Sequence, residues 1–311
     1  MPRTVSVPAV VIGVAATALL GLVTAKLQRS TVRASIAIIL FLSSPVVFHT
    51  LWTGSSSSVE VVSSLGWLLT TLIALERPQW WPAAAAGAIA GAGLYTHGGG
   101  MLRMPLLAAL SAVVLALPGT RTALRNAASA VGAFTMVAAP MAVGYLLNPD
   151  RFNQLITSHG LYDASRFNLL QGIREIVSWV GLVARSEAYH DYFNPSVWFL
   201  SGSSISAHLT EPRVLLLPLA LFVPVGLYRL VSQPTPAAYL ILGALVIAPV
   251  PTALLARPPA PAQLLFAVPL VVIAALVGAD YLVSRQNRWV RFAAYAAFLA
   301  LLPALALIRS W

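Results

Sequence analysis

The residues best suited to chemistry lie in one polar stretch, residues 148–213. It holds six of the nine acidic residues and three of the five histidines in the chain. These are Asp150, Asp163, Glu175, Glu187, Asp191 and Glu211, with His159, His190 and His208. Carboxylates and imidazoles are common proton donors and acceptors in catalysis. If the protein acts on a substrate, we expect the reaction here, where polar side chains, water and the bilayer surface meet.

The rest of the chain has the composition of a membrane protein. Of its 311 residues 59% are hydrophobic and 9% are charged, and the mean hydropathy is +0.82. Soluble domains carry about 25% charged residues. We therefore predict an all-α polytopic membrane protein. The net charge of +10 is expected to meet anionic lipid headgroups and not nucleic acid. The absence of cysteine excludes disulfides and thiolate chemistry within the chain.

Hydropathy predicts about ten spans. They cover residues 5–25, 34–51, 59–75, 83–96, 104–117, 127–147, 214–231, 237–255, 264–283 and 290–308. This divides the chain into an N-terminal membrane part (1–147), a long loop (148–213) and a C-terminal membrane part (214–311). Gly87 and Gly91 form a small-xxx-small pair, which indicates close helix packing.

The basic residues between spans predict an orientation. Ten of them, from Lys26 to Arg291, fall in one set of short loops, against four in the opposite set and at the ends: Arg3, Arg103, Arg257 and Arg309. The richer side is expected to be cytoplasmic. The long loop and both chain ends would then lie on the outer face, in the manner of a bacterial plasma-membrane protein.

The long loop itself contains two apolar features. Apolar residues recur at three- and four-residue spacing within residues 167–183, which predicts an amphipathic helix lying in the membrane interface. An aromatic cluster follows, with Tyr192 and Trp198 among its members. Tyrosine and tryptophan favour the headgroup level, so anchoring is the simplest interpretation of this cluster.

Further polar residues collect at the predicted outer ends of the spans. Glu60 begins the third span, Tyr95 and His97 precede a triple-glycine turn, and Arg103 follows that turn. A guanidinium at headgroup depth can donate two parallel hydrogen bonds to a phosphate, or it can contact ordinary lipid.

Two of these residues have a simpler interpretation, and so does Asp280 elsewhere in the chain. His97 could be a base or metal ligand, or a packed histidine. Glu60 could complement a helix dipole. Asp280, near the other end of its span, is expected to pair with Arg285.

The order of four sequence stretches resembles the GT-C membrane glycosyltransferases, in particular the dolichyl-phosphate-mannose–protein mannosyltransferase and aminoarabinose transferase relatives. The likeness is carried by residues 40–49, 93–103, 192–202 (followed by His208 and Pro212) and 248–254. This resemblance implies transfer of a sugar from a polyprenyl-phosphate-linked donor to an outer-face acceptor in the cell envelope, often with a divalent metal. It implies no other cofactor.

The resemblance also suggests roles for residues. Tyr95 and Arg103 would contact the carrier phosphate, while His97, Tyr192 and Trp198 would cover the sugar. Glu60 and His208 are the candidates for the catalytic group.

The family's catalytic acid belongs to its first outer loop, and this sequence begins where the family's second helix would begin. We therefore expect a start upstream, a truncated or inactive form, or a partner chain that supplies the loop. Two alternatives remain open: a non-catalytic membrane subunit that binds a partner or lipid, and a transporter of lipid-linked sugar.

Overall fold

The computed structural model describes residues 7–47, 50, 56–96, 98–148, 171, 174, 176–200, 214–215, 218–256 and 261–284. Within these ranges the chain forms helices and connecting turns, with no strand, as expected for an all-α protein. A helix at Val7–Gln28 overlaps the predicted span 5–25, the helix at Thr31–Leu42 covers only the first part of the predicted span 34–51, and the tenth predicted span (290–308) lies outside the described residues.

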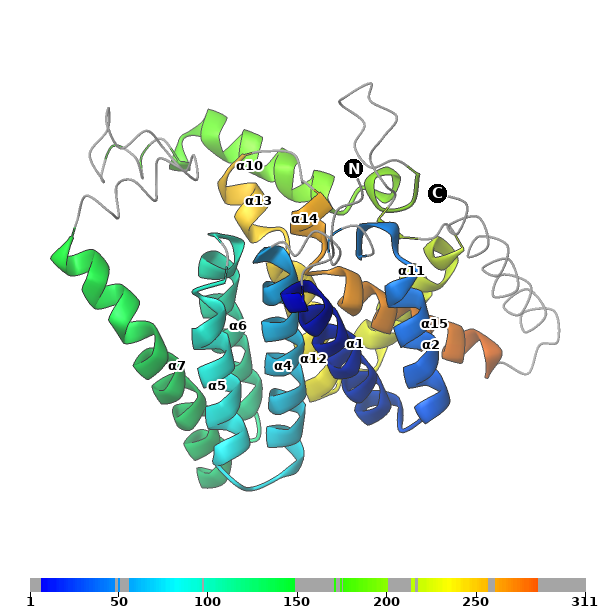
Figure 1. The fold of residues 1–311 in the computed structure, drawn as a ribbon, viewed down its shortest axis with the longest axis horizontal. Helices are drawn as coiled ribbons and strands as arrows, with labels where there is room; N and C mark the ends of the chain where they lie inside the picture. Colours follow the sequence, from blue (N-terminus) through cyan, green and yellow to red (C-terminus); the bar gives the residue numbers. More distant parts are fainter. Residues whose placement is uncertain are drawn as a thin grey trace.

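The N-terminal helices run alternately up and down (Figure 1). Their bounds are α1 (Val7–Gln28), α2 (Thr31–Leu42), α4 (Ser56–Glu76), α5 (Trp81–Gly93), α6 (Gly98–Ala116) and α7 (Arg121–Leu147).

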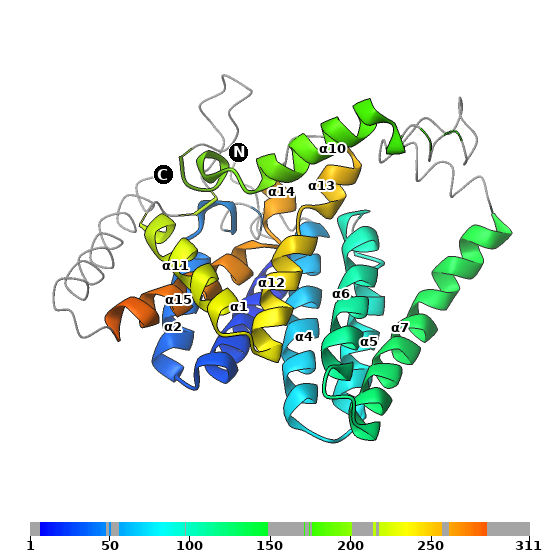
Figure 2. The ribbon, with the colours of Figure 1, turned by 180° about the vertical axis from the view of Figure 1, so that it is seen from behind.

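The C-terminal part of the described chain begins with a helix that does not run alongside the others. Its elements are α10 (Trp179–Tyr192), the π-helical turn Ser196–Leu200, α11 (Leu219–Ser232), α12 (Pro236–Ile247), α13 (Val250–Leu254), α14 (Pro261–Leu264) and α15 (Val268–Val283). Figures 1 and 2 show α10 lying across one end of the bundle, above α13 and α14, and not alongside the long helices. We call this end the α10 end.

Side-chain caps explain where four helices begin. Ser30, Thr120, Ser178 and Thr235 precede α2, α7, α10 and α12, and each hydroxyl accepts a hydrogen bond from the amide three residues later. Such a bond satisfies one of the amides that a helix start leaves without a partner. Pro236, directly after Thr235, has a fixed φ that suits the first helical position.

Among the described residues, five helices are long and apolar enough to cross a membrane: Val7–Gln28, Ser57–Glu76, Gly99–Ala116, Arg121–Leu147 and Pro236–Leu254. Shorter apolar helices occupy Thr31–Leu42, Leu219–Ser232 and Val268–Val283. The chain therefore has the helices of a membrane protein. The count of ten spans and the orientation remain predictions.

The centre of the bundle is α15. Eleven of its sixteen residues are buried, because it is apolar around its whole circumference and packs against α2, α11 and α12. In contrast, α7 has buried residues only in its first ten positions, from Ala123 to Ala130. Its later part leans away from the bundle and exposes apolar side chains such as Met136 and Leu146 (Figure 1). An exposed apolar helix surface of this kind suits contact with lipid.

At the end opposite α10, two exposed ion pairs join helices. Lys26 of α1 contacts Glu76 of α4 at 2.5 Å, and Arg33 of α2 contacts Asp280 of α15. The sequence suggested Arg285 as the ion-pair partner of Asp280. The observed partner is Arg33, on a helix far away in sequence, and Arg285 lies outside the described residues. Pairs this exposed contribute about 0–1 kcal/mol each.

The predicted loop helix differs from the observed one. Of residues 167–183 the structure describes 171, 174 and 176–183; residues 171, 174, 176 and 177 are helical, Ser178 is not, and α10 begins at Trp179. The helix continues to Tyr192, through residues that we had interpreted as an aromatic anchor. The Ser178 cap and the Asn194-Pro195 break that follows set its limits better than the apolar stripe did.

Gly87 allows α5 and α7 to touch backbone to backbone. A Cβ at position 87 would lie 1.9 Å from the Ala130 carbonyl oxygen, closer than any real contact. At Gly91 the Cβ would lie 2.7 Å from the Val137 side chain. The small-xxx-small prediction is therefore confirmed, and it joins these two helices.

We predict that Gly87→Ala will separate α5 from α7 and lower the unfolding midpoint of the purified protein by the equivalent of about 1–3 kcal/mol. Tryptophan-fluorescence thermal unfolding in detergent measures this shift. Gly132→Ala in α7 is the matched control, because nothing lies within 4 Å of a Cβ at that position. Equal midpoints for the two variants would contradict the close crossing.

Candidate functional site

Arg103 is the centre of the polar residues at the α10 end. It lies near the start of α6 and is 1% exposed, although arginine is among the residues least often buried. The glycines before it make this position possible. A Cβ at Gly99 would lie 3.4 Å from Glu60 Oε2, and one at Gly100 would lie 2.6 Å from the Gly93 carbonyl oxygen. The triple-glycine turn thus lets α6 begin in close contact with α4 and α5.

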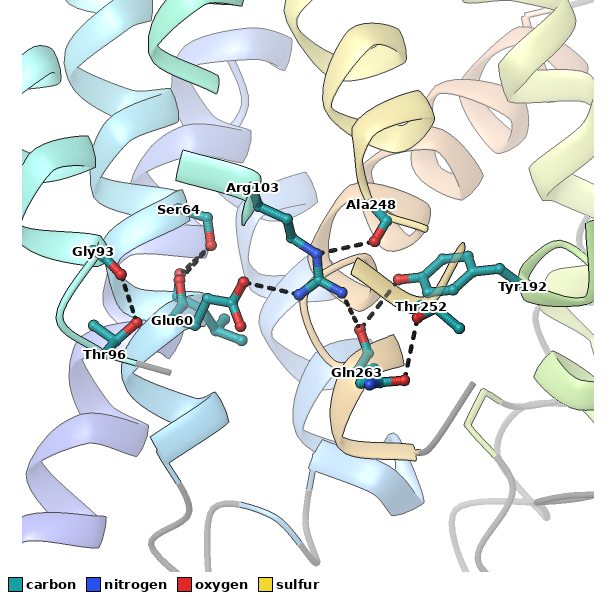
Figure 3. Close-up of polar contacts among 10 residues, drawn as sticks. Glu60, Ser64, Gly93, Thr96, Arg103, Tyr192, Ala248, Thr252 and Gln263 are labelled. Atoms are coloured by element: carbon teal, nitrogen blue, oxygen red, sulfur yellow. Dashed lines mark hydrogen bonds and ion pairs between the residues drawn. The ribbon is translucent and has the colours of Figure 1, made fainter. Parts of the chain in front are cut away.

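The guanidinium donates to oxygens from three elements. Its Nη1 lies 2.8 Å from Glu60 Oε1 on α4, Nε lies 2.9 Å from the Ala248 carbonyl oxygen and Nη2 lies 3.1 Å from the Gln263 carbonyl oxygen (Figure 3). The Phe266 ring stacks against it at 4.8 Å from the ring centroid. One side chain thereby connects α6 to α4, to the end of α12 and to α14.

The position of Ala248 explains why its carbonyl suits a cation. Ala248 is the C-cap of α12, and Pro249 and Pro251 follow it. The last carbonyls of a helix lack partners within the helix and carry the negative end of its dipole. A guanidinium at this point satisfies a carbonyl and is stabilised by the dipole.

The pair of Glu60 and Arg103 is shielded from solvent, with side chains 3% and 1% exposed. Removing two charges from water is costly, and the attraction between them repays that cost only when the remaining polar atoms are also satisfied. Here the additional carbonyl bonds of Arg103 provide that satisfaction. The pair therefore constrains geometry strongly, because either charge left alone would be very unfavourable.

Tyr192 connects α10 to this pair. Its side chain is fully buried, and its hydroxyl donates to the Gln263 carbonyl oxygen at 3.2 Å, the same oxygen that accepts from Arg103. Burial raises the pKa of Tyr192 above its ordinary value; Arg103 partly lowers it and Glu60 raises it. The hydroxyl therefore stays protonated and serves as a donor at neutral pH.

Two more aromatic side chains hold this region together. Tyr189, one turn earlier on α10, donates to the Val246 carbonyl oxygen at 3.1 Å, and partial burial raises its pKa. Trp198 is buried and donates from Nε1 to the Tyr192 carbonyl oxygen at 2.6 Å. These bonds fasten α10 and the turn after it to the end of the bundle.

The structure brings together four residues selected from the sequence: Glu60, Arg103, Tyr192 and Trp198. Tyr95 lies elsewhere. It is 54% exposed, and its hydroxyl donates to the Val137 carbonyl oxygen on α7 at 2.9 Å, away from the α4 side where Arg103 binds Glu60.

His97 and His208 lie outside the described residues. Their roles, and the phosphate-binding role of Tyr95 and Arg103, stay predictions.

Sequence reasoning missed Gln263, which supports both Arg103 and Tyr192. Its backbone oxygen accepts from both, and its side-chain Oε1 accepts from the Thr252 hydroxyl at 3.2 Å. The available signal was an amide side chain within an otherwise apolar and proline-rich segment. The segment 248–254 was noted for its family likeness, but not as a source of backbone acceptors.

Within the part of the chain that the structure describes, no group of three or more His, Asp or Glu residues is arranged to hold a metal ion. Glu60 is the one described carboxylate that contacts Arg103, and the guanidinium occupies one of its oxygens. These residues do not form a metal site, so we derive no metal-dependent step. No protein-family model matches the sequence, and no curated protein matches it significantly.

We predict that Arg103→Ala will destabilise the protein by about 3–5 kcal/mol, because it leaves the Glu60 carboxylate buried without its counter-ion. Thermal or denaturant unfolding in detergent measures the loss. Lys26→Ala is the control, since it removes a pair whose Glu76 is 61% exposed, and should cost about 0–1 kcal/mol. Similar losses for both variants would mean that the Arg103 pair is not sealed from water.

Proposed function

We propose that this chain is a membrane-integral glycosyltransferase that takes a sugar from a polyprenyl-phosphate-linked donor at the α10 end of the bundle. The observation that carries the proposal is the buried Glu60–Arg103 pair beneath α10. Transfer of a sugar from a lipid phosphate needs a proton acceptor and a ligand for the phosphate. The Glu60 carboxylate and the Arg103 guanidinium supply these two functions. We further propose that the α10 end faces the outer side of the membrane.

The proposed step begins with an exchange of anions at Arg103. Oxygens of the donor phosphate take the place of Glu60 Oε1 on the guanidinium, which frees the carboxylate. The acceptor hydroxyl then attacks the anomeric carbon and loses its proton to Glu60. The bond from that carbon to the phosphate oxygen breaks, and its electron pair leaves with polyprenyl monophosphate. Arg103 stabilises the charge that develops on the leaving group.

The surrounding helices favour this role for the pair over ion transport. Within the described spans, the ion pairs lie near the two ends of the bundle: Glu60–Arg103 at the α10 end, and Lys26–Glu76 and Arg33–Asp280 at the other. Proton and ion pathways typically use ionisable side chains distributed through the membrane. A buried charged pair at one end of the bundle suits chemistry on a headgroup.

A second candidate is a non-catalytic membrane subunit in which the pair only joins helices. It is favoured by the hydrogen bonds of the guanidinium, which go to Glu60 and to two backbone carbonyls of the same chain. This candidate predicts that Glu60 and Arg103 can be replaced together by apolar residues without loss of function, as is often possible for buried pairs that serve only stability.

We predict that Glu60→Gln will lower the release of polyprenyl monophosphate from donor by about 10²–10⁴-fold, the usual contribution of a general base. The assay uses the full chain in proteoliposomes with a panel of polyprenyl-phosphate hexoses and pentoses. The amide keeps the shape of the side chain but leaves Arg103 without its counter-ion, so release is compared per folded protein, with the folded fraction of each variant measured by thermal unfolding in detergent. Glu76→Gln is the matched control on the same helix.

Two results would count against the transferase. One is equal activity for Glu60→Gln and Glu76→Gln. The other is full function in the double variant Glu60→Leu with Arg103→Met, which would favour the non-catalytic subunit.

A further inference from the structure

The Glu60–Arg103 pair is enclosed on every side that the structure describes. Helices α4, α6, α12 and α15 supply Glu60, Arg103 itself, Ala248 and, just before α15, Phe266. Tyr192 of α10 completes the enclosure and is itself fully buried. A phosphate can therefore reach Arg103 only if one of these elements moves.

Among these elements α10 is the one suited to move. The others belong to apolar helices packed in the core of the bundle, whereas α10 lies across its end (Figures 1 and 2). It packs on the short helix α13 through one face, where Ala188 and Tyr192 are its buried residues. Its other residues are exposed or half-buried, and a helix held by two buried side chains opens at lower free-energy cost than the core helices do.

The first turn of α10 has a different environment from its end. Trp179 and Val180 are 81% and 78% exposed, so this turn presents apolar side chains outward. Trp is enriched where membrane meets water. One end of α10 is thus placed to lie in the lipid interface, while the other covers Arg103.

From this arrangement we infer that α10 is a lid on the Arg103 site, which opens when a lipid phosphate binds the guanidinium. The Gln263 carbonyl oxygen accepts from both Arg103 Nη2 and the Tyr192 hydroxyl. Movement of either donor therefore alters the hydrogen bond that the other makes. A phosphate that draws the guanidinium away also occupies space next to the Tyr192 ring. Tyr192 must then leave its buried position, and α10 tilts with it.

This inference rests on the proposed function only for the identity of the ligand, and the lid can be tested without sugar transfer. Because the chain has no cysteine, Ala188→Cys introduces a unique thiol on the covered face of α10. Its rate of reaction with a membrane-impermeant maleimide reports how often that face is exposed. Ser186→Cys, on the exposed face, controls for access of the reagent.

We expect polyprenyl monophosphate to speed labelling of Ala188→Cys by about tenfold, the effect of losing one or two hydrogen bonds that hold α10. Polyprenol without phosphate should have no effect, and the response should vanish when Arg103→Gln is added. A response to inorganic phosphate alone would identify a free anion and not a lipid as the ligand. Labelling that does not change with either phosphate, or that polyprenol raises equally, would overturn the lid.

Hydrogen exchange of the α10 amides in the unmodified protein, with and without polyprenyl monophosphate, repeats the test if Ala188→Cys does not fold. Faster exchange with the phosphate supports the lid, and unchanged exchange refutes it. A lid that opens in a protein without transfer activity would refute the glycosyltransferase alone. Transfer activity with a closed α10 would refute the lid alone.

Discussion

A guanidinium buried at 1% exposure must be neutralised and hydrogen-bonded, and the α10 end of this protein is built around that requirement. Arg103 obtains its counter-ion from α4 and its carbonyl acceptors from the end of α12 and from α14. Each of these acceptors exists because a helix stops or starts at that point. Carbonyl groups left without a helical partner at a break would be costly in a membrane protein. Here they accept hydrogen bonds from Arg103.

The same constraint explains the contrast between the two ends of the bundle. At the far end, Lys26–Glu76 and Arg33–Asp280 are exposed and contribute little to stability. At the α10 end, one pair is sealed from solvent and joined to Tyr192 through Gln263. A buried charge pair is weak evidence for stability, since apolar residues would do as well. Its burial beneath α10 fits the proposed role of the site in binding an anionic ligand.

Much of the helical architecture could be predicted from the sequence, because long apolar runs have few other solutions. A close helix contact at Gly87 could be predicted, but the sequence did not show that its partner is α7. Glu60 and Arg103 were both selected, but as separate candidates. Residues 43 positions apart give no sequence signal that they pair.

The parts that could not be predicted depend on backbone atoms and on tertiary contacts. The carbonyls of Ala248 and Gln263 carry no side-chain signature, so their role as acceptors emerges only from the fold. For Tyr192 the sequence suggested membrane anchoring or, by family resemblance, a place over the sugar; its bond to the carbonyl that Arg103 shares could not be predicted, because buried and interfacial tyrosines look alike in sequence. The limits of α10 followed from the Ser178 cap, a local signal that the broader apolar periodicity concealed.

Photoaffinity labelling tests the central claim that Arg103 is the ligand site for a lipid phosphate. A polyprenyl phosphate with a photoreactive group next to the phosphate would be cross-linked to the full chain in nanodiscs, and the attachment mapped by mass spectrometry. We predict attachment at the first turns of α4 and α6 or on α10 and α13, reduced by unlabelled polyprenyl phosphate but not by polyprenol. Attachment confined to lipid-facing residues of α1 and α7, insensitive to the competitor, would contradict the account.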